Sequence, residues 1–282
     1  MFPLTNAVGK GSSYGSYFLH IKPNNYYANA NANAKANANA KNIFLIGKAV
    51  TFDSGGLNIK TGPSMADMYT DMIGSAIVLS VLRLLNQNNL DKKHNIHLLL
   101  PIVENMVNNN AMRPGTVIKT TTNISVEIEN TDAEGRLCIA DAVIYANKLI
   151  KDSNLDVNNC LILDIATLTG AAIKITNDVA AICMGNDNAR RYINKLLEIS
   201  NKTSEYLDYL QLREEYIELL SSCVGHIKNS DAKGKAGCIQ GGTFINYFND
   251  KSIPFIHIDV APTVHCNDMV TSYGVNLLYE FI

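Results

Sequence analysis

The sequence predicts an α/β fold, and three observations support this prediction. Short apolar runs of strand length alternate along the chain with segments whose apolar residues have helical spacing. With 282 residues, of which 47% are hydrophobic and 18% are charged, the chain can bury a large core. Pro101, Pro114 and the pair Gly55 and Gly56 punctuate the connections between the runs. We therefore expect a single domain over residues 1–282.

Individual elements follow from the same patterns. Apolar runs predict strands, the last three of them buried, at 43–46, 96–100, 160–165 and 255–260. The apolar spacing of Ile73, Ile77 and Val81 predicts a helix after Asp71. Further helices are expected over 139–150, 189–200, 212–221 and 242–248. Two histidines, His97 and His257, fall inside predicted strands, and we interpret both as hydrogen-bonded core residues.

Residues 25–42 contain a low-complexity tract of alternating asparagine and alanine. The tract has no large apolar residue between 28 and 41, so it cannot bury enough surface to offset the entropy of ordering it. We interpret it as a disordered insertion. The fold should tolerate it, because the entropy of loop closure grows slowly with loop length.

Charge and cysteine usage exclude several classes of protein. The net charge of -2 and the isoelectric point near 6.3 provide no general basic surface for nucleic acid. The six cysteines are scattered without a C-x-x-C pair, which favours reduced thiols in a cytosol. No signal peptide and no apolar run of membrane-spanning length is evident. We expect a cytoplasmic protein with neither a membrane nor a nucleic acid as partner.

A set of four carboxylates and one amine is the strongest chemical feature. Lys48, Asp53, Asp132 and Glu134 fall at or just past predicted strand ends, where ligands gather in α/β sheets, and Asp71 precedes a helix. Oxygen-rich ligands suit divalent cations, and two cations that share carboxylates can hold a hydroxide and polarise a carbonyl. The set therefore indicates metal-assisted hydrolysis.

Each of these residues also has an ordinary structural explanation. Asp53 precedes Ser-Gly-Gly and could be a turn residue, and Asp71 could cap the helix that follows it. Asp132 and Glu134 could lie in a solvated loop, and Lys48 could be a surface lysine. Only the combination favours a metal site.

The combination resembles the cytosolic leucyl aminopeptidase family. Its signature Asn-Thr-Asp-Ala-Glu-Gly-Arg-Leu is present without change at 130–137, and two spacings match as well: Lys48 to Asp53 and Lys60 to Asp71. Other matching segments are 7–12, 164–171, 257–261 and 273–275. The resemblance implies the catalytic domain of that family, a mixed central β-sheet sandwiched between α-helices. Because six residues precede the first match, we expect the family's N-terminal domain to have no counterpart here.

The resemblance also implies a role for each ligand. Asp53 and Glu134 would bridge two divalent metal ions, zinc or manganese, with magnesium or cobalt as alternatives. Lys48 and Asp71 would complete one site, and Asp132 would complete the other with a side-chain oxygen and its backbone carbonyl. A coordinating lysine is a neutral amine, so we expect a strongly lowered pKa for Lys48, which an adjacent dication and burial would both produce.

Two positively charged side chains outside the ligand set are expected to act in catalysis. Lys60 would polarise the scissile carbonyl and stabilise the oxyanion that develops from it. Arg136 would hold a bicarbonate ion that assists proton transfer, because a guanidinium forks onto such an anion. A salt bridge from Arg136 to a neighbouring carboxylate is the alternative.

The family's pocket for the first side chain maps onto Met68, Thr167, Gly170 and Ala261. Small and flexible apolar groups of this kind suit leucine or methionine, although each residue could equally be core packing. Short peptides with a free N-terminus are the implied substrates.

Residues 203–235 depart most from the family pattern, and they read Val-Gly-His-Ile-Lys-Asn-Ser at 224–230. Relatives use this region for the pocket rim and for subunit contacts. They form hexamers, so we expect a homo-oligomer that stops at a trimer if the N-terminal domain is missing. A monomer or a poorly folding truncated product are further alternatives. The alternative functions are a non-catalytic metal-binding scaffold and a DNA-binding relative of the family.

Overall fold

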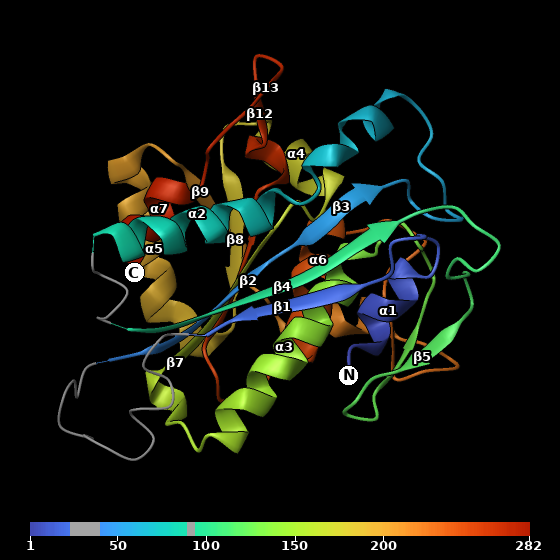
Figure 1. Cartoon of the computed structure of the whole chain (residues 1–282), viewed down its shortest axis with the longest axis horizontal. Coiled ribbons are helices and arrows are strands. Elements are labelled where there is room, and N and C mark those ends of the chain that lie inside the picture. Colours follow the sequence, from blue (N-terminus) through green and yellow to red (C-terminus); the bar gives the residue numbers. More distant parts are fainter. Residues whose placement is uncertain (23–39, 89–93) are drawn as a thin grey trace.

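The computed structural model describes residues 1–22, 40–88 and 94–282, and its centre is an eight-stranded β-sheet (Figure 1). The strand order is β1-β4-β2-β7-β11-β8-β9, and β3 pairs with β4 outside this path. The strands β4, β2, β7 and β11 are parallel neighbours, whereas β1 and β8 run antiparallel to β4 and β11. The sheet is therefore mixed, as expected. Its strands are β1 (Tyr17–Ile21), β2 (Asn42–Gly47), β3 (Ala49–Asp53), β4 (Asn95–Asn105), β7 (Cys160–Ala166), β8 (Ala181–Gly185), β9 (Leu207–Tyr209) and β11 (Phe255–Asp259).

Helices cover both faces of this sheet. One face carries α1 (Pro3–Gly9), α3 (Gly135–Asp152) and α6 (Gly237–Tyr247), and the other carries α2 (Ile73–Gln87), α5 (Arg190–Thr203) and α7 (Val275–Phe281). Successive side chains of β2 point to opposite faces of the sheet, so both faces need cover. Phe44 and Ile46 belong to the first core, and Ile43 and Leu45 belong to the second. Strands that are buried on both faces read as continuous apolar runs, which is the pattern that predicted β2, β7 and β11.

Smaller elements complete the described chain. A second sheet has the order β10-β6-β5, and a hairpin pairs β12 with β13. Their bounds are β5 (Val117–Lys119), β6 (Ser125–Glu127), β10 (Ile227–Lys228), β12 (His265–Cys266) and β13 (Met269–Val270). The remaining helical elements are α4 (Gly170–Thr176) and the 3-10 turns η1 (Pro63–Thr70), η2 (Val157–Asn159), η3 (Asp187–Ala189), η4 (Glu214–Leu220) and η5 (Ala261–Thr263).

Three local predictions need correction. The α-helix expected over 212–221 is the 3-10 helix η4, whose apolar residues Ile217 and Leu220 have the three-residue spacing of that helix. Asn42, assigned to the low-complexity tract, is the first residue of β2. Residues 23–39, most of that tract, lie outside the described residues, so its expected disorder stays a prediction. Pro101 lies within β4, although we place it in a connection.

The position of Pro101 follows from how β4 changes partner. β2 pairs with β4 as far as Leu99, and β3 takes over at Ile102. Pro101 falls in the gap between these two pairings. On the edge of β4 that faces β2 and β3, proline therefore interrupts neither of these two pairings.

The helical stretch Pro63–Gln87 is long and apolar enough to cross a membrane by composition, and it is the one such stretch in the described chain. It is interrupted between η1 and α2. In α2, Val78, Val81 and Leu85 are buried in the core that covers the sheet. Core packing therefore accounts for its apolar character.

A buried carboxyl group anchors α1 to α3. Asp141 accepts hydrogen bonds from the backbone N–H of Thr5 (2.8 Å) and from its hydroxyl (3.0 Å), and burial raises the pKa of Asp141 to about 7. Because the folded pKa exceeds the unfolded value of 3.8, the stabilisation is complete below that value and is lost as pH rises through about 7.

We expect Asp141→Asn, which is uncharged at every pH, to gain stability relative to the wild type as pH rises. Between pH 5 and 8 the difference in unfolding free energy should shift by on the order of 2 to 3 kcal/mol in favour of the variant. Urea unfolding of both proteins at the two pH values measures this shift. An equal difference at both pH values would contradict the expectation.

Candidate metal centre

A cavity of about 510 Å³ opens where several strands end. Lys48 follows β2, Asp53 ends β3, Thr167 follows β7, and Ala261 comes soon after β11. Because β2, β3, β7 and β11 all run in one direction, their carboxyl ends meet at the same edge of the sheet. Every residue that the sequence singles out lines this cavity: Lys48, Asp53, Lys60, Met68, Asp71, Asp132, Glu134, Arg136, Thr167, Gly170 and Ala261.

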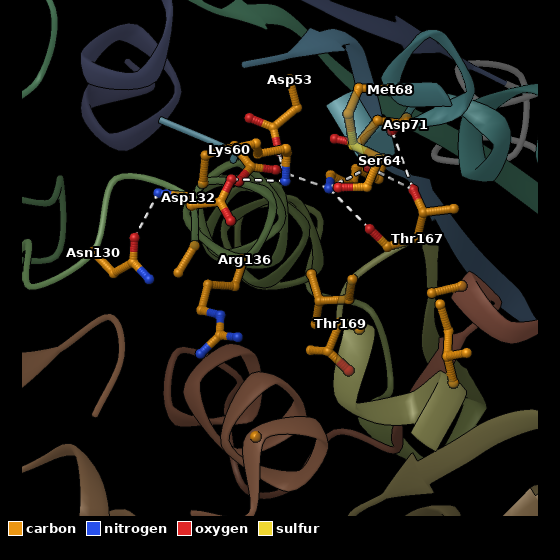
Figure 2. Close-up of a pocket in the computed structure, with 18 of the residues that line it drawn as sticks. Asp53, Lys60, Ser64, Met68, Asp71, Asn130, Asp132, Arg136, Thr167 and Thr169 are labelled. Carbon is orange, nitrogen blue, oxygen red and sulfur yellow. Dashed lines mark hydrogen bonds and ion pairs between the residues drawn. The ribbon is translucent and has the colours of Figure 1, made fainter. Parts of the chain in front are cut away.

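Three of the predicted ligands form one cluster of carboxylates. Ligand oxygens of Asp53, Asp132 and Glu134 all lie within 4.8 Å of one another. Figure 2 shows Asp53 and Asp132 on either side of Lys60, with Asp71 across the cavity. The buried Oδ2 atom of Asp71 has no hydrogen-bond partner among the described residues. Converging hard oxygen donors with spare acceptor capacity fit divalent cations.

Two lysines lie between these carboxylates as counterions. The Lys48 Nζ atom is 2.7 Å from Asp71 Oδ1 and 2.8 Å from Glu134 Oε1. The Lys60 Nζ atom is 2.8 Å from Asp53 Oδ2 and 2.7 Å from Asp132 Oδ1. Four carboxylates against two lysines leave an excess of negative charge, which is costly in a buried site unless cations offset it.

The expected lowering of the Lys48 pKa depends on a neighbouring dication, so it stays a prediction. Burial by itself lowers the pKa of this amine, but Asp71, Glu134 and Asp53 together outweigh burial and raise it above the ordinary value. Among the protein's own groups, Lys48 is therefore a charged ammonium. The neutral amine that coordination requires depends on the additional positive charge of a metal ion.

The pKa values of two carboxyl groups in the site are raised, whereas a simple ion pair with a lysine would lower them. Burial, with the negative charges of Glu134 and Asp53, raises the pKa of Asp71 well above its usual range despite Lys48. Burial and Glu134 likewise raise the pKa of Asp132 to about 6, although Lys60 opposes the shift. Crowded carboxylates of this kind favour the binding of a cation.

Glycines allow the close contacts of the cluster. Gly135 follows Glu134 at the start of α3, and a Cβ atom there would lie 2.4 Å from Lys48 Cε. Gly55 has a φ of +87°, and a Cβ atom there would lie 2.8 Å from Asp132 Oδ1. The glycine of the octapeptide is therefore needed for Lys48 to reach Glu134.

The ordinary explanations do not hold for Asp71, Glu134 and Lys48. Met72, not Asp71, occupies the N-cap position of α2, and the Asp71 side chain turns inward to accept a hydrogen bond from the Thr167 hydroxyl (2.7 Å). Glu134 is 1% exposed and Lys48 is 2% exposed, so neither lies in a solvated loop or on the surface. Asp53 does accept a turn hydrogen bond from the Gly55 N–H (2.9 Å), in addition to its place in the cluster.

Arg136 is buried and lies beneath the cluster in the view of Figure 2. Its Nη1 atom donates to the carbonyl of Asn229 (2.8 Å), and its Nε atom has no hydrogen-bond partner in the described chain. Burial lowers the pKa of Arg136 to about 10. The alternative salt bridge to a neighbouring carboxylate is not formed within the described residues.

The predicted side-chain pocket has further walls that the sequence did not indicate. Met68 comes from η1, and Gly170 begins α4. Ile173, Val264 and His265 also line the cavity. They belong to no sequence motif that could have predicted this position.

Two supporting residues were also missed. Asn105 donates from Nδ2 to Asp53 Oδ1 (2.8 Å) and to the Thr131 carbonyl (3.1 Å). Asp259 accepts from the Leu168 N–H (3.0 Å) and the Ala261 N–H (3.1 Å), so it joins two walls of the pocket. A single buried polar residue at a strand end gives no sequence signal of its own.

The core histidines are as expected. His257 Nδ1 lies 2.6 Å from Asp164 Oδ1, with both side chains fully buried, and His97 Nδ1 lies 3.0 Å from His20 Nε2. Neither belongs to the carboxylate cluster found in the described residues.

Comparison with known proteins agrees with this geometry. A family model described as "Cytosol aminopeptidase family, catalytic domain" matches residues 1–279. A "Probable cytosol aminopeptidase" of Persephonella marina is 37% identical over 92% of this chain and 48% of its own length. One of Prochlorococcus marinus is 37% identical over 98% of this chain and 54% of its own length.

A solved structure, "Bottromycin maturation enzyme BotP in complex with Mn", has a TM-score of 0.85 and 27% identity, covering 99% of this chain and 58% of that one. This chain spans about half the length of the curated relatives that it matches. The fold, the carboxylate cluster and the family match over residues 1–279 agree: the chain belongs to the cytosol aminopeptidase family and corresponds to its catalytic domain.

Proposed function

We propose that this chain acts as a metal-dependent aminopeptidase that releases N-terminal residues from short peptides. The observation that carries the proposal is the convergence of four carboxylates, two lysines and a buried arginine on one cavity. Membership of the cytosol aminopeptidase family supports the same activity. A non-catalytic scaffold or a DNA-binding role has no comparable support from the family match.

The proposed ligand set is the one that the resemblance implies. Asp53 and Glu134 would be shared by two divalent cations, with Lys48 and Asp71 on one and Asp132 on the other. Such a pair of cations supplies a nucleophilic hydroxide at neutral pH and polarises the scissile carbonyl. The oxygen donors accept manganese, zinc, magnesium or cobalt, and the manganese named for the solved relative makes manganese the first to test.

Two residues of the chain would act directly on the substrate. Lys60 is 17% exposed at the cavity wall, so its ammonium can face a peptide carbonyl and stabilise the negative charge that develops there. Arg136, with its unpaired Nε atom, would hold a bicarbonate ion that accepts a proton.

Part of the cavity lining suits an apolar first residue. Met68 and Val264 are apolar, and Gly170 and Ala261 are small. We propose a preference for leucine or methionine on this basis. A homo-oligomer, a trimer or hexamer, and a cytoplasmic location stay predictions from the resemblance.

A metal-titrated assay tests the proposal. We expect the chain, freed of metal with a chelator, to hydrolyse leucine and methionine amides only when manganese or zinc is restored, and to hydrolyse aspartate amide at least tenfold more slowly. N-acetyl-leucine amide is the matched control, because its blocked amine cannot be recognised as a free N-terminus. Equal hydrolysis of the acetylated amide, or turnover that ignores metal, would contradict the proposal.

A further inference from the structure

Asn229 follows β10 and is fully buried, with 0% of its surface exposed. Its Nδ2 group donates to the carbonyls of Asn130 (2.6 Å) and Ala133 (3.1 Å). Its Oδ1 atom accepts from the N–H groups of Glu129 (2.9 Å) and Asn130 (3.2 Å). One side chain thus uses both donors and its acceptor oxygen on a single stretch, residues 129–133.

The backbone of Asn229 extends the same connection. Its carbonyl accepts from Arg136 Nη1 (2.8 Å), and its N–H donates to the carbonyl of Glu127 (3.0 Å). Asn229 therefore joins the stretch that contains Asp132, the guanidinium of Arg136, and the end of β6.

The opposite side of the same stretch is held by a different segment. Thr131 N–H donates to Asn58 Oδ1 (2.9 Å), and the Thr131 hydroxyl donates to the carbonyl of Gly55 (2.6 Å). Asn58 is close in sequence to Lys60, which pairs with Asp132 at 2.7 Å. The 129–133 stretch is thus held on one side by Asn229 and on the other side by the segment 55–60, which carries Lys60.

We propose that Asn229 is a positioning residue that fixes Asp132 and Arg136 relative to the metal cluster without touching metal or substrate. The inference rests on the proposed function, and it deepens that function by naming a residue outside the ligand set. Residues that hold metal ligands in place without binding the metal set the geometry of those ligands. Their loss usually weakens metal binding or activity by about 10 to 100-fold.

Only asparagine satisfies this place. Aspartate has the same shape but lacks the two donors, so its buried charge would face the carbonyls of Asn130 and Ala133. Alanine would leave the Ala133 carbonyl and the N–H groups of Glu129 and Asn130 without these partners, whereas the Asn130 carbonyl would keep the Ala133 N–H (3.3 Å). Residue 229 belongs to the segment 203–235 that departs most from the family pattern, and there it supports the site.

The test is Asn229→Ala in the full chain, with calorimetric titration of Mn²⁺ as the main readout and kcat and KM for leucine amide as the second. We expect the Mn²⁺ dissociation constant to rise at least tenfold and kcat to fall at least tenfold, with a smaller change in KM. Asn229→Ser, whose hydroxyl can restore one bond, should be intermediate, and it decides the test if the alanine variant does not fold.

Asn186→Ala is the matched control. Asn186 also clasps backbone, donating to the Ile253 carbonyl (2.8 Å) and accepting from the Phe255 N–H (3.0 Å), but it does not line the cavity. Its Mn²⁺ affinity should equal that of the wild type even if its melting temperature falls. Unchanged Mn²⁺ affinity in the Asn229 variants, or an equal loss in Asn186→Ala, would overturn the proposal.

The two proposals can fail separately. If the wild type binds Mn²⁺ but hydrolyses no aminoacyl amide, the proposed function fails, and the Mn²⁺ affinities still decide the role of Asn229. If the wild type binds none of the four candidate cations, manganese, zinc, magnesium or cobalt, both proposals are overturned.

Discussion

Glu134→Ala is expected to abolish hydrolysis of leucine amide while leaving the fold intact. Glu134 contributes an oxygen to the cluster that spans 4.8 Å, and the same carboxylate lies 2.8 Å from Lys48. If two cations share Glu134, as we propose, its loss would remove an oxygen ligand from both and weaken the site that supplies the nucleophile. We expect kcat/KM to fall by at least about 1,000-fold, equivalent to roughly 4 kcal/mol of transition-state stabilisation.

The fold should survive because the substitution removes one of several crowded negative charges. Lys48 keeps its contact with Asp71 (2.7 Å), so no buried charge is left unpaired. Circular dichroism and thermal unfolding check this point, and calorimetry should show loss of at least one Mn²⁺ site.

Asp53→Ala should behave like Glu134→Ala, because Asp53 is the other proposed shared ligand. Glu104→Ala is a matched control, since that carboxylate accepts a hydrogen bond from Ser12 (2.6 Å) and does not line the cavity. Near wild-type turnover in Glu134→Ala or Asp53→Ala would remove the basis of the dinuclear proposal.

Lys60→Ala is expected to lower kcat by about 100 to 1,000-fold with little change in KM. An ammonium aimed at a developing oxyanion acts most strongly in the transition state, so its loss appears mainly in kcat. Steady-state kinetics with saturating Mn²⁺ measure this split. An effect confined to KM would mean that Lys60 only binds the substrate.

The Mn²⁺ affinity of the variants distinguishes the role of Lys60 from that of the proposed metal ligands. Lys60 neutralises Asp53 (2.8 Å) and Asp132 (2.7 Å), so its removal frees two carboxylates for cations. We therefore expect Mn²⁺ binding in Lys60→Ala to be kept or strengthened, in contrast to Glu134→Ala. Weaker Mn²⁺ binding would assign Lys60 a structural role.

Lys251→Ala is the control for Lys60→Ala. Lys251 also pairs with a carboxylate, Glu214 at 2.7 Å, and neither Lys251 nor Glu214 lines the cavity. Its replacement should therefore change kcat less than twofold.

The regular part of the fold was predictable where burial imposes a simple pattern. β2, β7 and β11 are buried along their whole length, so their sequences are continuous apolar runs. β1 and β3 were not predicted, because each is only partly buried, and β8 was missed although it is buried along its whole length. The pairing of β3 with β4 shifts register before Asp53, and only the partner strand fixes that shift.

The site was predictable to the level of residue identity. The octapeptide at 130–137, Lys48, Asp53, Lys60 and Asp71 identified the family and the charged lining of the cavity. These residues are recognisable because their chemical types and spacings are unusual in combination. Their pairing was not predictable, since nothing local decides that Lys48 contacts Asp71 and Glu134 while Lys60 contacts Asp53 and Asp132.

The sequence by itself therefore determined which charged groups line the cavity, through composition, periodicity and one intact motif. The tertiary structure alone decided how those groups are held. Asn229 reaches Glu129 and Asn130 across 100 and 99 residues of chain, and Asn105 reaches Asp53 across 52. Such contacts depend on the docking of distant segments around the sheet, and a single buried amide becomes a support only once folding has surrounded it with unpaired backbone groups.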